Sequence, residues 1–369
     1  MGPDDALVAA LLIERSKRQR SKWFEYIAVL PESEPIAATW TESAILYLGD
    51  ERIRNAAKED KAHRTSLVTK LQDIISSSVP SVEVTETSVE WACSIIASRS
   101  CFLNEQGWRD LRATMKSSQS NDSLSAGIRS AQGRPHKTLG VLVPYLDMFN
   151  HSTDPVAVDR YCERARTLQL VSTRTYRAGE EVQIHYGALC NYELIRWWGF
   201  ALEKNTHEYI PVHPSEVIPA EFMNISKADA VAAADVLYIA HDLTNSDPSY
   251  IREVSNECSL DWHLLVRMQL AAIHVRTCPC KLPSDLASFL GGNEFLCQCV
   301  RDLCQGWLRK FATRKLLKLG QLSPPPLSPA PGTSFREAAS NARVLPIAQA
   351  FRAGRTVILE SLLGSTSPH

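Results

Sequence analysis

The spacing of apolar residues predicts a mainly helical region over the first hundred residues. Apolar positions recur at helical intervals in four stretches, each close behind a Ser, Thr or Asp that can act as an N-cap. These stretches are DDALVAALLIERSKR, SKWFEYIAVL, TESAILYLGD and SVEWACSIIASR. Residues 115–137 are by contrast polar, rich in Ser and Gly and without a period, which indicates a surface loop.

The pattern changes between residues 139 and 204. The runs LGVLVPYL, LQLVST and EVQIHY are short and β-branched or alternating, as is typical of strands, and YRAGEE supplies a turn. Tyr186 and Gly187 are expected to end the last strand, and Asn191 to cap the helix that follows.

Helical spacing returns beyond residue 205. It is found in SKADAVAAADVLYIAHD, DWHLLVRMQLAAIHVR and NEFLCQCVRDLCQGWLRKFATRKLLKLG, the last of which should stop at Gly320. The proline-rich QLSPPPLSPAPGTS then interrupts the helix, and a final helical pair is expected after it.

Composition and charge narrow the class of protein. The chain has 369 residues, of which 44% are hydrophobic and 22% charged, so it can bury a substantial core. Its 40 basic and 41 acidic residues nearly cancel, so the net charge gives no reason to expect binding to nucleic acid or to an anionic membrane. There is no apolar run of the ~18 residues that a membrane span needs, and no secretory pattern. We expect an intracellular monomer, cytoplasmic or nuclear, with a protein partner.

Two polar concentrations stand out, PYLDMFNHS and EVQIHYGALCNYELIRWWGF. In the first, Asp147, Asn150 and His151 follow an apolar run, and such groups are costly to bury without partners. They either cap a turn or line a binding site. Taken singly, Tyr186 is also explained as a packed strand residue, and Arg99 as a surface or cap residue.

Ten cysteines in a chain of this length suggest reduced thiols rather than a disulfide framework. Cys297, Cys299 and Cys304 in CQCVRDLC, with Cys278 and Cys280 nearby, leave a zinc site open as an alternative. Because positions i and i+2 of a helix point to different faces, we expect buried thiols and no metal.

The segments YLDMFNHS, RAGEEVQIHYG and NYELIRWWGFALEKN, in this order, resemble the second half of a SET domain. The similar group includes Rubisco large-subunit lysine methyltransferase and actin-histidine methyltransferase. The resemblance implies an α+β fold, a partial SET-like β fold with a helical insertion, followed by an all-helical substrate-binding domain. The implied domains are a helical inserted region (1–114), a flexible polar loop (115–138), the C-terminal part of the SET domain (139–204) and a substrate-binding domain (205–369).

The resemblance also implies S-adenosylmethionine as the cofactor and assigns the site residues. Tyr186 would be the catalytic residue beside the methyl-transfer channel, and Tyr192, Trp197, Trp198 and Phe200 would form part of its wall. The implied cofactor-binding residues are Arg99, Asp147, Met148, Phe149, Asn150 and His151.

The implied activity is S-adenosylmethionine-dependent N-methylation of a protein, with the substrate bound through the C-terminal helical domain. We expect lysine as the acceptor. Cys101 stands where the histidine-modifying relative has an asparagine, and it lacks the amide that could hold an imidazole. Relatives begin with a β segment carrying a Gly-x-Gly turn, whereas this sequence starts in the helical part. We therefore expect weak cofactor binding, and a noncatalytic SET-like interaction module remains the alternative.

Overall fold

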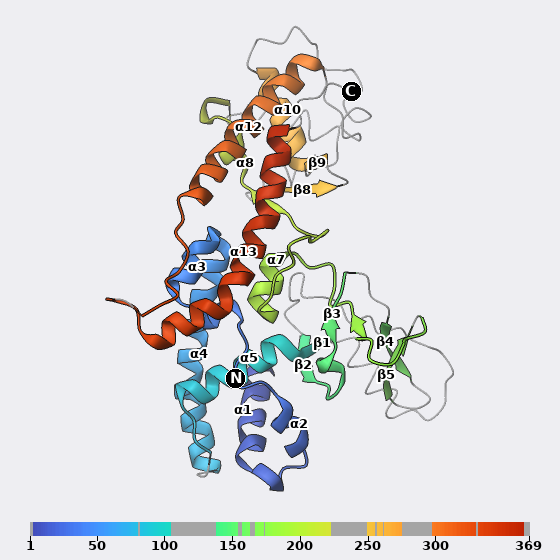
Figure 1. The fold of residues 1–369 in the computed structure, drawn as a ribbon, viewed down its shortest axis with the longest axis vertical. Helices are drawn as coiled ribbons and strands as arrows, with labels where there is room; N and C mark the ends of the chain where they lie inside the picture. Colours follow the sequence, from blue (N-terminus) through green and yellow to red (C-terminus); the bar gives the residue numbers. More distant parts are fainter. Residues whose placement is uncertain are drawn as a thin grey trace. The chain divides into compact units, whose positions relative to one another are not determined.

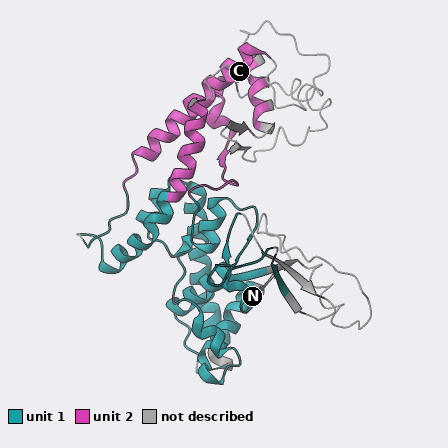
Figure 2. Cartoon of the chain, turned by 45° about the vertical axis from the view of Figure 1, so that its right-hand side comes forward, with its two compact units in different colours: residues 1–202, 324–349 teal, residues 203–323, 350–369 magenta. Residues whose placement is uncertain are grey.

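The computed structural model describes residues 3–79, 82–104, 138–153, 157–162, 167–172, 174–222, 249–254, 257–260, 262–274, 297–329 and 331–364. The chain falls into two compact units (Figure 2). Unit 1 comprises residues 1–202 and 324–349, and unit 2 comprises residues 203–323 and 350–369. Among the described helices, none has the length and apolar character of a membrane span. The predicted polar loop, apart from Thr138, lies outside the described residues.

Unit 1 begins with a set of helices, drawn in blue to cyan in Figure 1. They are α1 (Pro3–Ser16), the 3-10 turn η1 (Arg18–Arg20), α2 (Phe24–Val29), η2 (Ala37–Thr39), α3 (Glu42–Leu48), α4 (Glu51–Ser78) and α5 (Glu86–Arg99). Of the predicted caps, Thr41 caps α3. α5 is capped instead by Thr85, ahead of the predicted stretch, in a capping box with Ser88, and the residue before α2 is Trp23 rather than Ser21. The apolar faces of α1, α4 and α5 share one core, which buries Leu12 and Ile95 among others. The helical prediction for this region is confirmed.

The strands of unit 1 pair in three small sheets. β1 (Ser100–Asn104) runs antiparallel to β2 (Thr138–Leu142), and β4 (Ala157–Cys162) runs antiparallel to β5 (Thr167–Ser172). Between them, the 3-10 turn η3 (Leu146–Met148) leads into β3 (Asn150–His151), which lies parallel to β6 (Gln183–Ile184). The β3–β6 pair brings the Asn-His dipeptide next to the segment that leads to Tyr186. β6 ends at Ile184, so Tyr186 follows the strand rather than closing it.

A short helical segment comes next, made of α7 (Asn191–Glu193) and the π-helix η4 (Leu194–Trp198). Cys190 is the N-cap, so the expectation that Asn191 caps this helix was wrong. Asn191 is fully buried, and its amide instead donates to the carbonyl and accepts from the backbone N–H of Leu202. The π-helix ends at Gly199, whose φ is +75°. A Cβ there would lie 2.6 Å from the carbonyl carbon of Pro35, so only glycine fits.

Unit 2 contains a three-stranded antiparallel sheet as well as helices. Its strands, in the order β7-β8-β9, are β7 (Ile210–Val212), β8 (Ser249–Val254) and β9 (Glu257–Leu260). Its helical elements are α8 (Pro214–Val217), η5 (Ala220–Phe222), α10 (Trp262–His274), α12 (Gln298–Gly320) and the end of α13 (Phe335–Gly364). They share a core that includes Met268, Trp307 and Phe311.

These elements confirm part of the prediction for the C-terminal region and correct the rest. α10 and α12 are where the pattern places them, and α12 ends at Gly320 as predicted. The prediction of an all-helical domain was wrong, because β7 pairs with β8 across more than thirty residues of intervening sequence. The final helical pair is one helix, α13, with Pro346 inside it. Residues 226–242, read as a helix, lie outside the described residues.

The last part of the chain contributes to both units. Asn341 of α13 is buried in unit 1, where its amide donates to the Pro326 carbonyl. Arg343 donates to the carbonyl of Ser33, also in unit 1. Residues 324–349 thus associate with the first unit, whereas the predicted substrate-binding domain (205–369) included them. The functional meaning of that domain stays a prediction.

Candidate active site

Five of the seven predicted site residues lie in the short segment 147–151, which runs from η3 through Phe149 into β3. The side chain of Leu146 is buried and anchors the start of this segment. The backbone N–H of Phe149 donates to the Leu146 carbonyl at 3.3 Å. At the other end, Ser152 N–H donates to the carbonyl of Ile184 in β6 at 2.9 Å. These contacts fix both ends of the segment on unit 1.

Arg99, the last residue of α5, holds the first half of the segment. Its Nη1 donates to the backbone carbonyl of Asp147 at 2.9 Å and lies 3.6 Å from Met148 Sδ. Its Nη2 pairs with Glu34 Oε1 at 3.0 Å, and both side chains are largely buried. The structure therefore brings Arg99, Asp147 and Met148 together, as predicted, and adds Glu34.

Asp147 is also held by a residue that the sequence did not single out. Tyr26 of α2 donates its hydroxyl to Asp147 Oδ2 at 2.6 Å. Burial raises the pKa of Asp147, while this hydrogen bond and the Arg99 charge act to lower it. Burial and the Asp147 carboxylate raise the pKa of Tyr26 far above its ordinary value. Tyr26 precedes Asp147 by 121 residues, and no motif around it signals the contact.

Tyr186 holds the second half of the segment. Its hydroxyl donates to the carbonyl of Phe149 at 2.7 Å, and its backbone N–H donates to His151 Nδ1 at 3.1 Å. Burial raises the pKa of Tyr186 to about 12, so the hydroxyl is neutral at physiological pH. Gly187 follows with φ +134°, which leaves the backbone beside the tyrosine free of a side chain.

The predicted aromatic wall is only half present. Trp198 stacks on Tyr186 with ring centroids 5.5 Å apart, and Phe200 meets the same ring edge-on at 6.4 Å. Tyr192 and Trp197 instead meet Arg196, which donates to the Tyr192 hydroxyl and lies over the Trp197 ring.

The remaining polar atoms suit a ligand that carries both a donor and an acceptor. Arg99 Nε and Asp147 Oδ1 are buried, and neither has a hydrogen-bond partner among the residues that the structure describes. Such atoms are costly unless something meets them. An amino-acid group offers a carboxylate to the first and an ammonium to the second, so the residues fit the amino-acid end of S-adenosylmethionine. Asn150 is exposed and donates to Glu181 Oε1 at 2.7 Å, so its amide also faces a carboxylate.

The cysteines give the zinc alternative no support in the described part of the chain, where no three His, Cys, Asp or Glu side chains are placed to hold a metal. Cys297 and Cys299 lie close, with their sulfurs 2.8 Å apart. Cys304 is buried, and burial raises the pKa of its thiol to about 12. Cys278 and Cys280 lie outside the described residues.

Comparison with known proteins places this geometry in a family. The SET domain model matches residues 8–187. The chain is 26% identical over 207 residues to SET domain-containing protein 4 of Homo sapiens, a match that covers 56% of this chain and 43% of that protein. It is 23% identical over 218 residues to ribosomal lysine N-methyltransferase set10 of Schizosaccharomyces pombe (58% and 35%). It is 24% identical over 225 residues to actin-histidine N-methyltransferase of Drosophila melanogaster (60% and 39%). Each match covers less than half of the relative's length.

A solved structure of Rubisco LSMT bound to AdoMet has a similar fold. It superimposes with a TM-score of 0.56 at 19% sequence identity, and the match covers 99% of this chain and 74% of that one. At this identity the likeness shows a shared fold, and it agrees with the α+β SET-like prediction. The match over residues 8–187 therefore supports the assignment of this part of the chain to the SET-domain family.

Proposed function

We propose that this chain is an S-adenosylmethionine-dependent protein methyltransferase whose acceptor is a lysine side chain. The observation that carries the proposal is the clamping of residues 147–151 between Arg99 on one side and Tyr186 on the other. Relatives support it, because one is named a ribosomal lysine N-methyltransferase and a structural neighbour is described as bound to AdoMet.

The residues of the clamped segment would divide the work of holding the cofactor. Arg99 and Asp147 would meet its amino-acid end through the two buried atoms that have no partner. Asn150 would add its amide there, and the backbone of His151 would meet the adenine, with Met148 and Phe149 lining the pocket. When bound, S-adenosylmethionine supplies a methyl group on a positively charged sulfur.

Tyr186 would position the acceptor nitrogen. Its hydroxyl hydrogen is directed at the Phe149 carbonyl, so its oxygen lone pairs remain to accept an N–H of the lysine amine. That amine must be neutral to attack, and a dry aromatic setting lowers the pKa of a lysine. Tyr186 would hold this nitrogen where the methyl group of the bound cofactor would be presented. Positioning of this kind supplies much of the rate.

We favour lysine over histidine as the acceptor because of the residue at position 101. Cys101 lies in β1 opposite Val141 and is half-buried. Its thiol is a weak donor and acceptor and cannot hold an imidazole nitrogen as an amide would. The acceptor is therefore expected to be the flexible amine of lysine.

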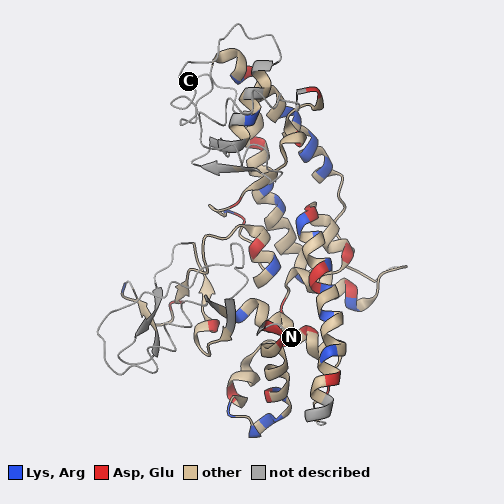
Figure 3. Ribbon diagram, turned by 180° about the vertical axis from the view of Figure 1, so that it is seen from behind, with Lys and Arg blue, Asp and Glu red and all other residues tan. Residues whose placement is uncertain are grey.

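Unit 2 is proposed to bind the protein substrate. Its helix α12 carries six basic residues and one acidic residue, and Figure 3 shows Lys and Arg along it. Lys310 and Lys318 are exposed. Replacing both with Glu should reduce methylation of a protein substrate and leave the affinity for S-adenosylmethionine unchanged. A truncation at residue 205 is a poorer test, because it removes residues 324–349 from unit 1.

The proposal is tested with the full chain and labelled S-adenosylmethionine. Calorimetry measures cofactor binding, and incubation with cell extract followed by hydrolysis and amino-acid analysis separates methyllysine from methylhistidine. We expect binding, and label in methyllysine that is lost in Tyr186→Phe. Label in methylhistidine would overturn the acceptor assignment. Absence of cofactor binding at millimolar concentration would overturn the proposed function.

A further inference from the structure

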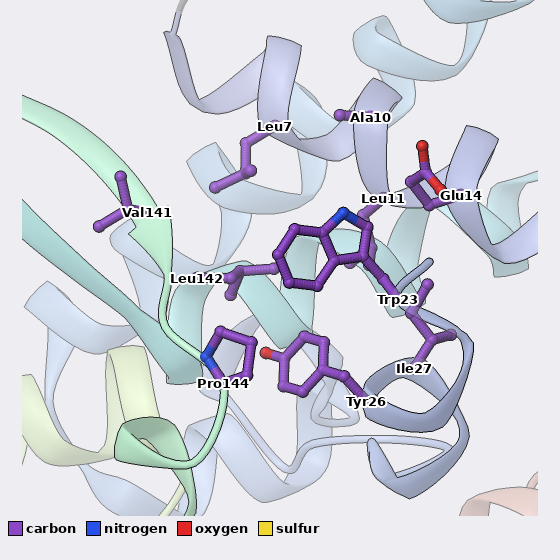
Figure 4. Close-up of a pocket in the computed structure, with 10 residues that line it drawn as sticks. All are labelled: Leu7, Ala10, Leu11, Glu14, Trp23, Tyr26, Ile27, Val141, Leu142 and Pro144. Atoms are coloured by element: carbon purple, nitrogen blue, oxygen red, sulfur yellow. The ribbon is translucent and has the colours of Figure 1, made fainter. Parts of the chain in front are cut away.

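An apolar cavity of about 270 Å³ lies in unit 1 between α1, α2 and β2 (Figure 4). Its wall includes Leu7 and Leu11 of α1, Ile27 of α2 with Trp23 just before that helix, and Leu142 of β2. Tyr26 also lines it, and because its hydroxyl is already bonded to Asp147, it offers the cavity mainly its ring. The cavity is therefore suited to a bulky apolar group.

The turn that joins α1 to α2 is basic. Residues 15–22, RSKRQRSK, contain five Lys or Arg and no acidic residue, and Figure 3 shows this charge at the turn. Arg18 and Arg20 are exposed, and within the described residues neither forms an ion pair. Lys22 is also exposed and directly precedes Trp23, whose side chain is 42% exposed. The basic turn thus adjoins one wall of the cavity.

We propose that this surface docks a segment of a partner protein in which a bulky apolar side chain is flanked by acidic residues. The apolar side chain would enter the cavity against Trp23 and Tyr26, and the acidic residues would meet Arg18, Arg20 and Lys22. The acidic residues of the partner segment are inferred from charge complementarity, because exposed cations that form no ion pair are stabilised most when carboxylates are added. A large side chain that fills a pocket at the centre of a charged rim is the usual arrangement of a strong protein contact.

A protein segment fits better than the other polyanions that a basic turn attracts. Nucleic acid presents phosphates and flat bases, whereas the hollow here is lined mainly by aliphatic and aromatic side chains, with one carboxylate, Glu14, that is paired with Lys17. A membrane surface is met by apolar side chains that project outward. Trp23 and Phe24 are partly exposed here, but the apolar lining of the cavity is concave and suits one inserted side chain. The proposal does not depend on methyl transfer, since the residues involved are outside the clamped segment.

The test measures binding of a labelled peptide, in which one phenylalanine is followed by a run of glutamates, to the full chain by fluorescence anisotropy. We expect Arg18→Glu with Arg20→Glu to weaken binding at least tenfold. Ala10→Trp should block it, because Ala10 lines the cavity from an exposed helix position and the larger ring fills the space. Lys70→Glu, on an exposed position of α4, is the matched control and should bind normally.

The peptide itself supplies two further controls. Replacing its phenylalanine with alanine should weaken binding, as should replacing its glutamates with lysines, and added salt should weaken it progressively. Binding that is insensitive to both protein variants would overturn the proposal. So would failure of the peptide to bind while the chain binds vesicles containing phosphatidylserine, because the turn would then be a membrane contact.

Discussion

Replacing Tyr26 with phenylalanine removes one hydroxyl and tests how the segment of residues 147–151 is held. That hydroxyl is 2.6 Å from Asp147 Oδ2, and the other carboxylate oxygen is already buried without a partner. A hydrogen bond to a charged group contributes ~1.5–3 kcal/mol. We expect Tyr26→Phe to lower the free energy of unfolding of unit 1 by about that amount at neutral pH.

The pH dependence of this loss is a second check on its cause. The Tyr26 hydrogen bond acts to lower the pKa of Asp147, so it stabilises the ionised carboxylate. Its contribution to stability is then fully present above the pKa of Asp147 and fades as the pH falls through that pKa. The difference between wild type and Tyr26→Phe should therefore shrink in acid.

The assay is urea unfolding at neutral pH and near pH 4, followed by calorimetry with S-adenosylmethionine. Tyr145→Phe is the matched control, since Tyr145 lies beside the same segment but is 84% exposed. A double-mutant cycle with Asp147→Asn isolates the pair. An equal loss of stability at both pH values, or a change below ~0.5 kcal/mol in the cycle, would refute the reasoning. If stability falls but cofactor affinity does not, Tyr26 supports the fold and not the site.

Three further predictions concern Tyr186 and Gly199. Tyr186→Phe should reduce methyl transfer ~100-fold by releasing the acceptor. Because it also removes the bond to Phe149, cofactor affinity should fall too, but by less than the transfer rate, and equal turnover would remove Tyr186 from catalysis. Because burial raises the pKa of Tyr186 from 10.0 to about 12, its contribution to stability is present below pH 10 and is lost as the pH rises through 12. The stability advantage of wild type over Tyr186→Phe should accordingly fall between those values in urea titrations. Gly199→Ala should lower the free energy of unfolding of unit 1 by more than ~2 kcal/mol, because of its positive φ and the clash of a Cβ with Pro35. Gly306→Ala is the control and should be neutral or stabilising, because among the described residues a Cβ there would meet nothing within 4 Å. Similar effects of the two substitutions would contradict the clash.

The parts of the fold that the sequence predicts are those set by local spacing. Thr41 caps α3 where the pattern places a cap, and α12 stops at Gly320. The sheet of unit 2 was not predicted because β7 and β8 pair across a long separation. SYIREV does not alternate regularly between apolar and polar residues, and a single short run does not reveal its partner.

The candidate site, like the fold, could be predicted from the sequence only in part. The motif residues Asn150, His151 and Tyr186 are brought together as predicted. The residues that fix them are not in the motifs, because Tyr26 and Glu34 reach the site only through the packing of α2 and the segment after it. A residue that acts through a distant contact leaves no periodic or compositional signal in its own neighbourhood.

The backbone just before the motif explains why such contacts are needed. Tyr145 has φ 73° and ψ −42°, a conformation that costs a residue with a side chain ~1–3 kcal/mol. Its own side chain is 84% exposed and cannot offset this cost. The offset must come from the next two residues, through the burial of Leu146 and the bonds from Tyr26 and Arg99 to Asp147. The turn that presents Asn150 and His151 is therefore stable only while α2 and α5 hold Asp147. The site thus depends on two helices that contribute a single predicted site residue, Arg99.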